Sequence, residues 1–217
     1  FTPSVAFGQL DGEAEGLAVA RLRTIEKTGL IFSSWVGSFE LPSYNEREEC
    51  NDRKFECYQP TVELIEFEAD SDNEQLIKFL QANQNKVMFI RYNITIGGNM
   101  ELLDARAWNE NPPEGLVRSI RVSPSGSRRF FSLFGRVIRI EDRGTFGSAW
   151  EGLYLDKERR KVHPVSLVSE EVVRYLERAM GSRTHYHMGI SVAYFAGSRE
   201  TPYDIYAVDY DRAPNPP

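Results

Sequence analysis

A short motif occurs twice in the chain, 115 residues apart, and it constrains the fold more than any other feature of the sequence. Residues 25–37 read IEKTGLIFSSWVG and residues 140–152 read IEDRGTFGSAWEG, which align without a gap. The identical pairs are Ile25/Ile140, Glu26/Glu141, Gly29/Gly144, Ser33/Ser148, Trp35/Trp150 and Gly37/Gly152. Similarity at a fixed spacing is typical of a duplicated structural unit, so the sequence predicts two copies of one fold.

The same elements are expected around both copies of the motif. Runs rich in β-branched and aromatic residues, several of them alternating apolar with polar, predict five strands per copy. In the first copy these strands are at 17–25, 35–41, 61–68, 86–94 and 101–108; in the second they are at 130–140, 150–154, 161–165, 184–195 and 203–210. Pro164 makes the third strand of the second copy an edge strand at best.

One helix is expected after the third strand of each copy. In the first copy Asp72 is the expected N-cap, and Leu76, Ile77, Phe79 and Leu80 form the apolar stripe. In the second copy Ser169 is the expected N-cap, Gly181 ends the helix, and the stripe consists of Val172, Val173, Leu176 and Met180.

The resulting order, three strands, a helix and two strands, is that of an OB-type barrel. An SH3-like barrel or an open α+β sheet would share most of this pattern. We expect a mainly β chain of two tandem OB-like barrels, with the first at 1–110, a Pro- and Gly-containing linker at 111–127, the second at 128–212 and an unstructured tail at 213–217.

The repeated Trp and Gly residues have two interpretations. Trp35 and Trp150 could be platforms on which a ligand stacks. Their equivalent places, each two residues before Gly37 or Gly152, instead favour four structural core residues, because a shared fold explains a residue kept in both copies.

The first copy resembles small bacterial cell-envelope proteins of unknown function. Those proteins have a GxxxKTWEGEL-like strand, then a short strand, a helix and a final VxLxY strand. The matching pieces are residues 29–41, 67–80 and 87–92, and the second copy matches through 144–155. The Lys before the family's aromatic residue is missing here, since the chain has Ser33-Ser34-Trp35. The resemblance implies no catalytic residues.

Cys50 and Cys57 are the only cysteines and lie in one polar stretch. Their isolation favours a disulfide that closes a short loop, and the alternative is two free thiols in a cytosolic protein. A disulfide implies an oxidising compartment, so we expect a periplasmic or extracellular, cell-envelope location. The chain begins at Phe1, and any signal peptide or anchor is expected to precede it.

His185 and His187 are the best candidates for a metal site. On a strand both imidazoles point to one face, and such pairs can hold zinc or copper. His163 or a carboxylate would have to supply a third ligand. The alternative is a solvated strand face that carries two histidines.

Charge is divided unequally between the copies. Residues 1–117 contain 10 Lys and Arg against 20 Asp and Glu, whereas residues 118–217 contain 16 against 12. Seven arginines begin the second part and are candidates for binding an anion or a partner: Arg118, Arg121, Arg128, Arg129, Arg136, Arg139 and Arg143. They could also dock onto the acidic first copy or be ordinary solvated surface.

No phosphate-binding loop, dinucleotide fingerprint, GxSxG or HExxH motif is present. We therefore expect no cofactor and a non-catalytic binding or scaffolding protein that contacts a protein or a component of the envelope surface. The alternative is an OB-type module for an oligosaccharide or nucleic acid, although the net charge of −6 argues against nucleic acid. A hydrolase with two convergent carboxylates is less favoured. Oligomeric state is open.

Overall fold

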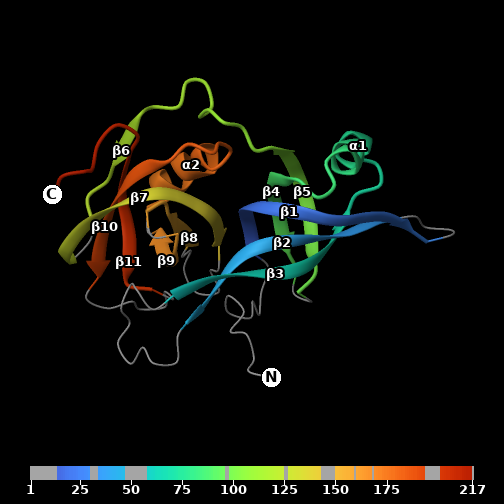
Figure 1. Ribbon diagram of the computed structural model, residues 1–217, viewed down its shortest axis with the longest axis horizontal. Coiled ribbons are helices and arrows are strands. Elements are labelled where there is room, and N and C mark those ends of the chain that lie inside the picture. The colour runs from blue at the N-terminus through green and yellow to red at the C-terminus, as the bar shows by residue number, and fades with distance from the viewer. Residues whose placement is uncertain are drawn as a thin grey trace.

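The computed structural model describes residues 14–29, 34–46, 58–95, 98–124, 127–142, 150–158, 160–167, 169–193 and 201–216. The described chain is mainly β, and apart from the short strand β6 its two halves contain the same elements in the same order (Figure 1). The first half contains β1 (Ala14–Thr28), β2 (Ser34–Glu46), β3 (Tyr58–Ala69), α1 (Glu74–Ala82), β4 (Val87–Ile94) and β5 (Met100–Ala107). The second contains β6 (Ser119–Arg121), β7 (Ser127–Asp142), β8 (Trp150–Asp156), β9 (Val162–Leu167), α2 (Glu170–Ala179), β10 (Tyr186–Ala193) and β11 (Tyr203–Asp209).

Strand pairing closes each half into a five-stranded ring. In the first, β1 pairs with β2 and β4, β2 with β3, β4 with β5, and β3 runs parallel to β5. In the second, β7, β8, β9, β10 and β11 repeat these pairings in the same places. With a helix between the third and fourth strands, this is the arrangement of an OB-type barrel, so the expected fold class is confirmed. We call the rings barrel 1 and barrel 2.

The spacing of 115 residues persists in the strand register. Ile25 pairs with Gly37 in barrel 1, and Ile140 pairs with Gly152 in barrel 2. In β1 the pairing shifts at a bulge between residues 22 and 24, and in β7 it shifts at the residues 115 positions later. A bulge bends and twists a strand, so its repetition indicates that both rings curl in the same way.

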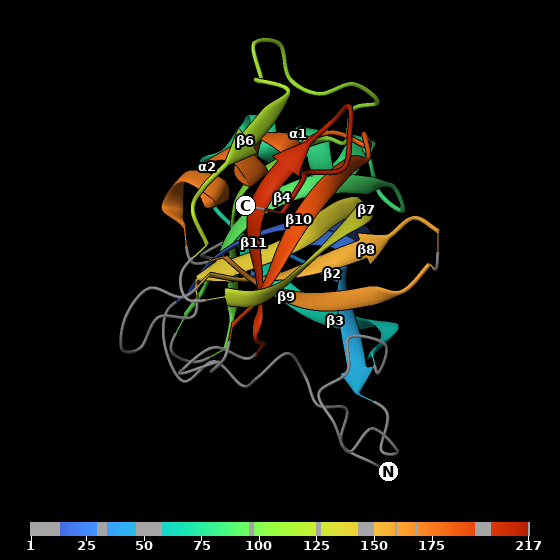
Figure 2. The ribbon, with the colours of Figure 1, turned by 90° about the vertical axis from the view of Figure 1, so that its left-hand side faces the viewer.

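The two barrels share one sheet. β1 pairs with β7 in antiparallel register, with Leu17 opposite Ile140. Figure 1 shows the two rings side by side, and in Figure 2, where barrel 2 is in front, β2 and β3 of barrel 1 lie at the bottom of the sheet. A separate apolar cluster fills the junction and contains Val19, Ile138, Leu153 and Val162. The barrels therefore form one body rather than two domains on a flexible tether.

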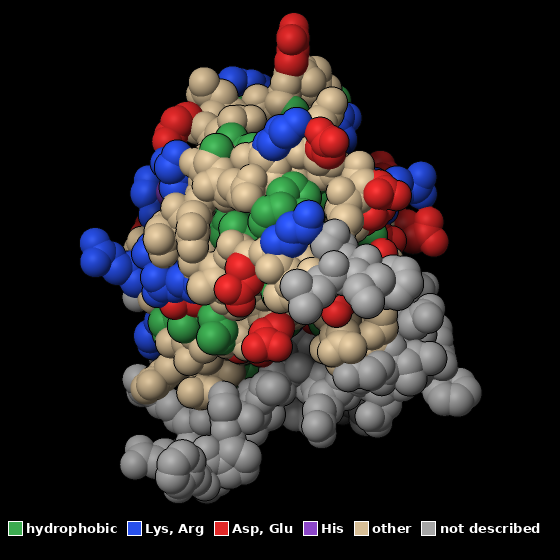
Figure 3. Space-filling view, turned by 90° about the vertical axis from the view of Figure 1, so that its right-hand side faces the viewer, with side chains coloured by type: hydrophobic (Ala, Val, Ile, Leu, Met, Phe, Trp, Pro, Cys, Tyr) green, Lys and Arg blue, Asp and Glu red, His purple; other side chains and the backbone are tan. Residues whose placement is uncertain are grey.

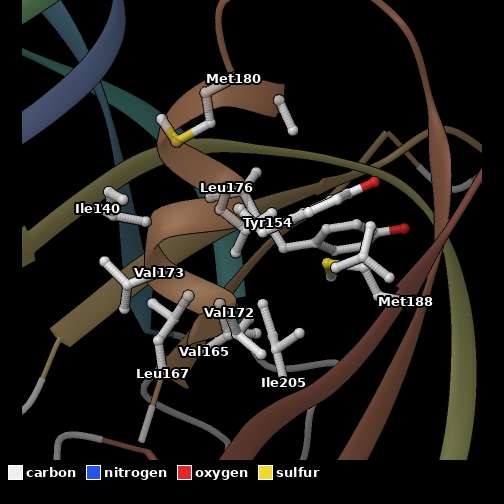
Figure 4. Packing of buried hydrophobic residues seen from close by; sticks show 14 of the residues in the cluster. Ile140, Tyr154, Val165, Leu167, Val172, Val173, Leu176, Met180, Met188 and Ile205 are labelled. Carbon is white, nitrogen blue, oxygen red and sulfur yellow. The ribbon is translucent and has the colours of Figure 1, made fainter. Parts of the chain in front are cut away.

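Each barrel has its own apolar core, and the helix contributes to it. In barrel 2 the buried face of α2 packs on strands from around the ring, as Figure 4 shows. The labelled residues are Ile140, Tyr154, Val165, Leu167, Val172, Val173, Leu176, Met180, Met188 and Ile205. In barrel 1, α1 buries Leu76, Ile77 and Leu80 in the same way. The apolar stripes expected on the helices are therefore the faces that enter the cores.

Several local expectations need correction. The N-cap of α1 is Asn73 rather than Asp72, and its side chain accepts a hydrogen bond from the amide of Leu76. β9 is not an edge strand, because it pairs with β8 over its whole length and with β11 through Asp204 opposite Ser166. Its proline is tolerated because that second pairing covers a single position.

Trp35 and Trp150 lie in equivalent places but not at the centre of either core. Each lies at the start of the second strand of its barrel, within its first two residues, and pairs with the last residue of the third strand. Both are half-buried and pack against the edge of the neighbouring cluster. Their position at the start of the second strand explains the difference from the expected central anchors.

The segment between the barrels and the C-terminal tail both make specific contacts. Residues 119–121, in the expected linker, form β6 on the outer edge of β11. In the tail, the backbone oxygen of Asn215 accepts hydrogen bonds from Arg121 and from the hydroxyl of Tyr206. No helix among the described residues is long and apolar enough to cross a membrane.

Candidate functional site: a basic face on barrel 2

The arginines singled out in the sequence are spread over different parts of barrel 2. Arg118 forms an ion pair with Asp211, 2.6 Å away, and Arg121 lies over the ring of Tyr206. Arg129 is exposed. Arg143 and the side chain of Arg128 lie outside the described residues. Arg136 and Arg139 occupy two distinct polar sites, which are the strongest candidates for function.

Arg136 belongs to a surface where cationic and aromatic side chains converge. We call this surface the basic face and define it by Phe134, Arg136, Lys157, Arg183, His185 and His187. The register explains its assembly, because Phe134 lies opposite His187 in the β7–β10 pairing. The backbone amide of Lys157 donates to the carbonyl of Phe134, which brings the end of β8 to the same place.

Phe134 is the centre of one half of this face. Its ring centroid lies 4.6 Å from that of His187 and 5.9 Å from that of His185. The ammonium of Lys157 lies 5.0 Å from the same ring centroid, which is within the range of a cation–π contact. The alternation expected for this strand is confirmed, since both histidines are half-buried while Tyr186 and Met188 point into the core.

Trp108 holds the other half of the face in place. Its indole N–H donates to the carbonyls of Met180 and Ser182, at 3.1 and 3.0 Å. The guanidiniums of Arg136 and Arg183 lie 4.5 and 5.3 Å from its ring centroid. Trp108 follows β5 of barrel 1, so this contact also ties the first barrel to the second. Two arginines are thereby fixed in position before any partner arrives.

Electrostatics keep this face positive while leaving one histidine neutral. Burial lowers the pKa of His185, and the nearby charges of Arg136 and Lys157 lower it further. Burial also lowers the pKa of Arg136, with Arg183 acting in the same direction. Arg183 pairs with Glu110 at 2.7 Å. Lys157 makes no ion pair within the described part of the chain.

The described residues contain no group of three His, Cys, Asp or Glu side chains placed to hold a metal. His185 and His187 share the basic face, whereas His163 is fully buried on β9, opposite Tyr154. The rings of His163 and Tyr154 are stacked, with centroids 6.4 Å apart. The three histidines expected as metal candidates therefore do not meet in the described part of the structure.

Arg139 lies in the second polar site, which is buried between the barrels. Its guanidinium donates to Oε1 of Glu141 from Nε at 2.8 Å and from Nη2 at 2.6 Å. It also binds Glu63 and the carbonyl of Pro42, both from barrel 1. The phenol of Tyr92, from β4 of barrel 1, donates to the same oxygen of Glu141. Arg139 thus docks onto the acidic first copy, as one interpretation of the sequence predicts.

The partners of this network fix its protonation. Burial alone would lower the pKa of Arg139, but Glu141, Tyr92 and Glu63 raise it well above its ordinary value, so the guanidinium stays charged. Burial raises the pKa of Tyr92 well above its usual range, and Glu141 adds to the effect, so the phenol stays protonated. A buried charge needs such complete pairing to be tolerated.

Two buried carboxylates face each other here, since Glu141 pairs with Glu151 across β7 and β8. A hydrolase would need one of them free to exchange a proton with a substrate. Instead Arg139 and Tyr92 occupy one oxygen of Glu141, and the hydroxyl of Ser166 donates to Glu151 at 2.8 Å. The arrangement is suited to holding the barrels together rather than to acid–base chemistry.

Residues 12–106 and 126–214 match one family model, described as Domain of unknown function (DUF8785). The chain belongs to this family. The two matched segments are consistent with a tandem duplication, and they coincide with barrel 1 and barrel 2. No curated protein matches the sequence.

Two solved structures aligned with the chain are of the single-stranded DNA binding protein from Thermus aquaticus. A deletion mutant aligns over 94% of this chain and 96% of its own, with 10% identity and a TM-score of 0.28. The wild-type protein aligns over 94% and 92%, with 10% identity and a TM-score of 0.26. The backbones superpose too poorly to support any conclusion about this chain.

Sequence reasoning missed four residues at the basic face. Trp108 and Arg183 lie outside the repeat motif, and only the folded chain brings them to Arg136. Phe134 lies on β7 and Lys157 in the turn after β8, and a strand-by-strand pattern cannot show that they meet. The expected disulfide between Cys50 and Cys57 lies outside the described residues and stays a prediction.

Proposed function

We propose that this protein is a non-catalytic binding protein that holds an acidic protein surface on its basic face. The observation that carries the proposal is the convergence of Arg136, Lys157 and Arg183 on two aromatic rings. Arginine and aromatic residues dominate the binding energy of many protein interfaces. Because these side chains are already ordered by cation–π contacts and hydrogen bonds, binding a partner costs less side-chain entropy.

The carboxylates near the basic face leave it available to an acidic partner. Asp209 lies opposite His187 in the register, but its Oδ1 already accepts the backbone amides of Asp211 and Arg212. Glu110 pairs with Arg183 at the surface, and exposed pairs of this kind contribute only about 0–1 kcal/mol. A better-placed carboxylate on a partner can therefore replace it.

Binding of a labelled poly-glutamate peptide, followed by fluorescence anisotropy at low salt, tests this proposal. Lys157→Glu and Arg183→Glu should each weaken binding by about tenfold, which corresponds to about 1.4 kcal/mol. Arg174→Glu is the matched control, because Arg174 is an exposed cation on α2 whose one ion pair among the described residues is with Glu170. Equal loss in the control would refute a specific surface, and so would tight binding of a single-stranded oligonucleotide without binding of the peptide.

We further propose a periplasmic or extracellular location, in the cell envelope, supported by the cysteine pair of the sequence and by the resemblance noted above. Mass measurement of native protein after alkylation, with and without reductant, tests it. A disulfide predicts alkylation of Cys50 and Cys57 only after reduction. Alkylation of both thiols without reductant would remove the support for this compartment.

A further inference from the structure

One surface that occurs in both barrels is exposed in barrel 1 and covered in barrel 2. It is the outer face of the first three strands, and Glu26 and Glu141 lie at matching positions on it. In barrel 2 this surface is covered by barrel 1, and Glu141 is fully buried against Arg139 and Tyr92. In barrel 1 no described segment covers the surface, and Glu26 is exposed.

The register defines what the open surface presents. Glu26 lies opposite Val36, which lies opposite Glu68, so two carboxylates flank one aliphatic side chain across β1, β2 and β3. In the neighbouring row Ser38 lies opposite Glu66. These residues line a groove of about 290 Å³ on the outside of the ring, together with Leu64. We call this outer surface of β1, β2 and β3 the acidic face. It is formed by Glu26, Val36, Ser38, Glu40, Val62, Leu64, Glu66 and Glu68.

Three carboxylates of the acidic face take no part in the ion pairs between described residues. Glu26, Glu66 and Glu68 form no ion pair within the described part of the chain. Other residues there form ion pairs with one another. This contrasts with Glu40 on the same face, which pairs with Arg23. Three unpaired carboxylates on one rigid sheet create a negative field that favours a cationic partner.

Exposed aliphatic residues continue the acidic face along β3. Val62 is 62% exposed and Leu64 is 65% exposed, and both point to the same side of the strand as Glu66. Figure 3 looks onto the barrel-1 side of the molecule, where small hydrophobic patches lie among acidic and basic side chains. Apolar side chains rimmed by charge are typical of protein interaction surfaces.

We propose that the acidic face of one molecule binds the basic face of a second copy of the same chain. This inference rests on the proposed function and names its partner. The charges are complementary, since Glu26, Glu66 and Glu68 would meet cations such as Arg136 and Lys157. Phe134 would provide the apolar surface for Leu64. In barrel 2 the carboxylate on this surface, Glu141, already pairs with a guanidinium, that of Arg139. The proposed contact would give the carboxylates of barrel 1 an equivalent pairing.

The two faces cannot meet within one molecule. They belong to different barrels, and the β1–β7 pairing together with the buried Arg139 network fixes those barrels relative to each other. Contact between unlike surfaces of two copies is heterologous and leaves one acidic and one basic face free at the ends. The expected assembly is therefore a head-to-tail chain of molecules that grows with protein concentration and shortens in high salt.

Sedimentation velocity of the wild-type protein and of two charge-reversal variants tests this arrangement. The wild type should associate at low salt, whereas Glu68→Lys and Lys157→Glu should each stay monomeric, with self-association weakened by about tenfold or more. A one-to-one mixture of the two variants should form dimers, because the intact basic face of the first meets the intact acidic face of the second. Glu74→Lys, on the exposed side of α1, is the control and should associate like the wild type.

The outcomes separate this inference from the proposed function. A wild type that stays monomeric at high concentration and low salt, while still binding poly-glutamate through Lys157, would overturn self-association alone. Association that survives Glu68→Lys would overturn the acidic face as the docking surface. If Lys157→Glu changes neither association nor peptide binding, both proposals fail.

Discussion

Barrel 1 and barrel 2 have the same strand pairing, the same bulge and the same glycine in the second strand, yet they differ at one surface. Glu26 is exposed to solvent and Glu141 is buried, although the two residues occupy matching positions in the repeated motif. Burial is possible for Glu141 because barrel 1 supplies Tyr92 and Glu63 around Arg139. The comparison shows that the environment of a repeated residue depends on what the rest of the chain brings to it.

The largest effect is expected when the buried carboxylate is neutralised. Glu141→Gln keeps the size of the side chain but leaves the guanidinium of Arg139 without its main partner, so we expect a loss of about 3 kcal/mol or more in the free energy of unfolding. Glu26→Gln at the matching position should change it by less than about 0.5 kcal/mol. Urea unfolding measures both, and equal effects would break the contrast between the two surfaces.

A smaller difference is expected at the repeated glycines. A Cβ on Gly37 would lie 2.3 Å from the backbone oxygen of Thr24, whereas one on Gly152 would lie 3.2 Å from the equivalent oxygen of Arg139. Gly37→Ala should therefore cost about 1–3 kcal/mol, and Gly152→Ala less than about 1 kcal/mol. Urea midpoints for the two variants give the comparison. A larger loss for Gly152→Ala would show that the tighter packing is in barrel 2.

The repeated tryptophans should behave alike. Because Trp35 and Trp150 are half-buried at the ends of their barrels, each Trp→Ala substitution should cost about 1–2 kcal/mol, less than the loss of a fully buried ring. Thermal and urea unfolding of both variants measure this. A loss several times greater at one position would mean that the two edges are packed differently.

The smallest effect concerns pH and belongs to barrel 2, which contains all three histidines. The folded-state pKa of His185 is lowered, so the unfolded chain binds a proton more readily. Stability should therefore decrease as pH falls below about 6.5, down to the lowered pKa of the folded state. His185→Asn should reduce the slope of unfolding free energy against pH in this window. An unchanged slope would exclude His185 as its source.

Repetition and periodicity were sufficient to predict the element order, the two barrels and both helix stripes. These features depend on local sequence, where apolar spacing decides which side of a strand or helix enters a core. The N-cap at Asn73 was missed by one residue because Asp72 and Asn73 both favour that position. The pairing of the strands into rings followed from the fold class that their order indicates.

The sites could be predicted only in part. The seven arginines were recognised as a group, but nothing in their spacing distinguishes buried Arg139 from exposed Arg129. Trp108 was missed because its role depends on carbonyls at the end of α2, more than 70 residues away. The β1–β7 pairing was also missed, because a repeat predicts contacts within each copy and is silent about contacts between copies.

The β1–β7 pairing also has a consequence for the order in which the protein matures. Barrel 1 is synthesised first, but the hydroxyl of buried Tyr92 finds its acceptor only in Glu141, 49 residues further along the chain. Until β7 leaves the ribosome, residues 16–18 of β1 present an unpaired edge of the kind that promotes misassembly. We therefore expect barrel 1 to complete its folding only when barrel 2 arrives, so that the nascent chain passes through a stage in which its first half depends on chaperones or on rapid elongation.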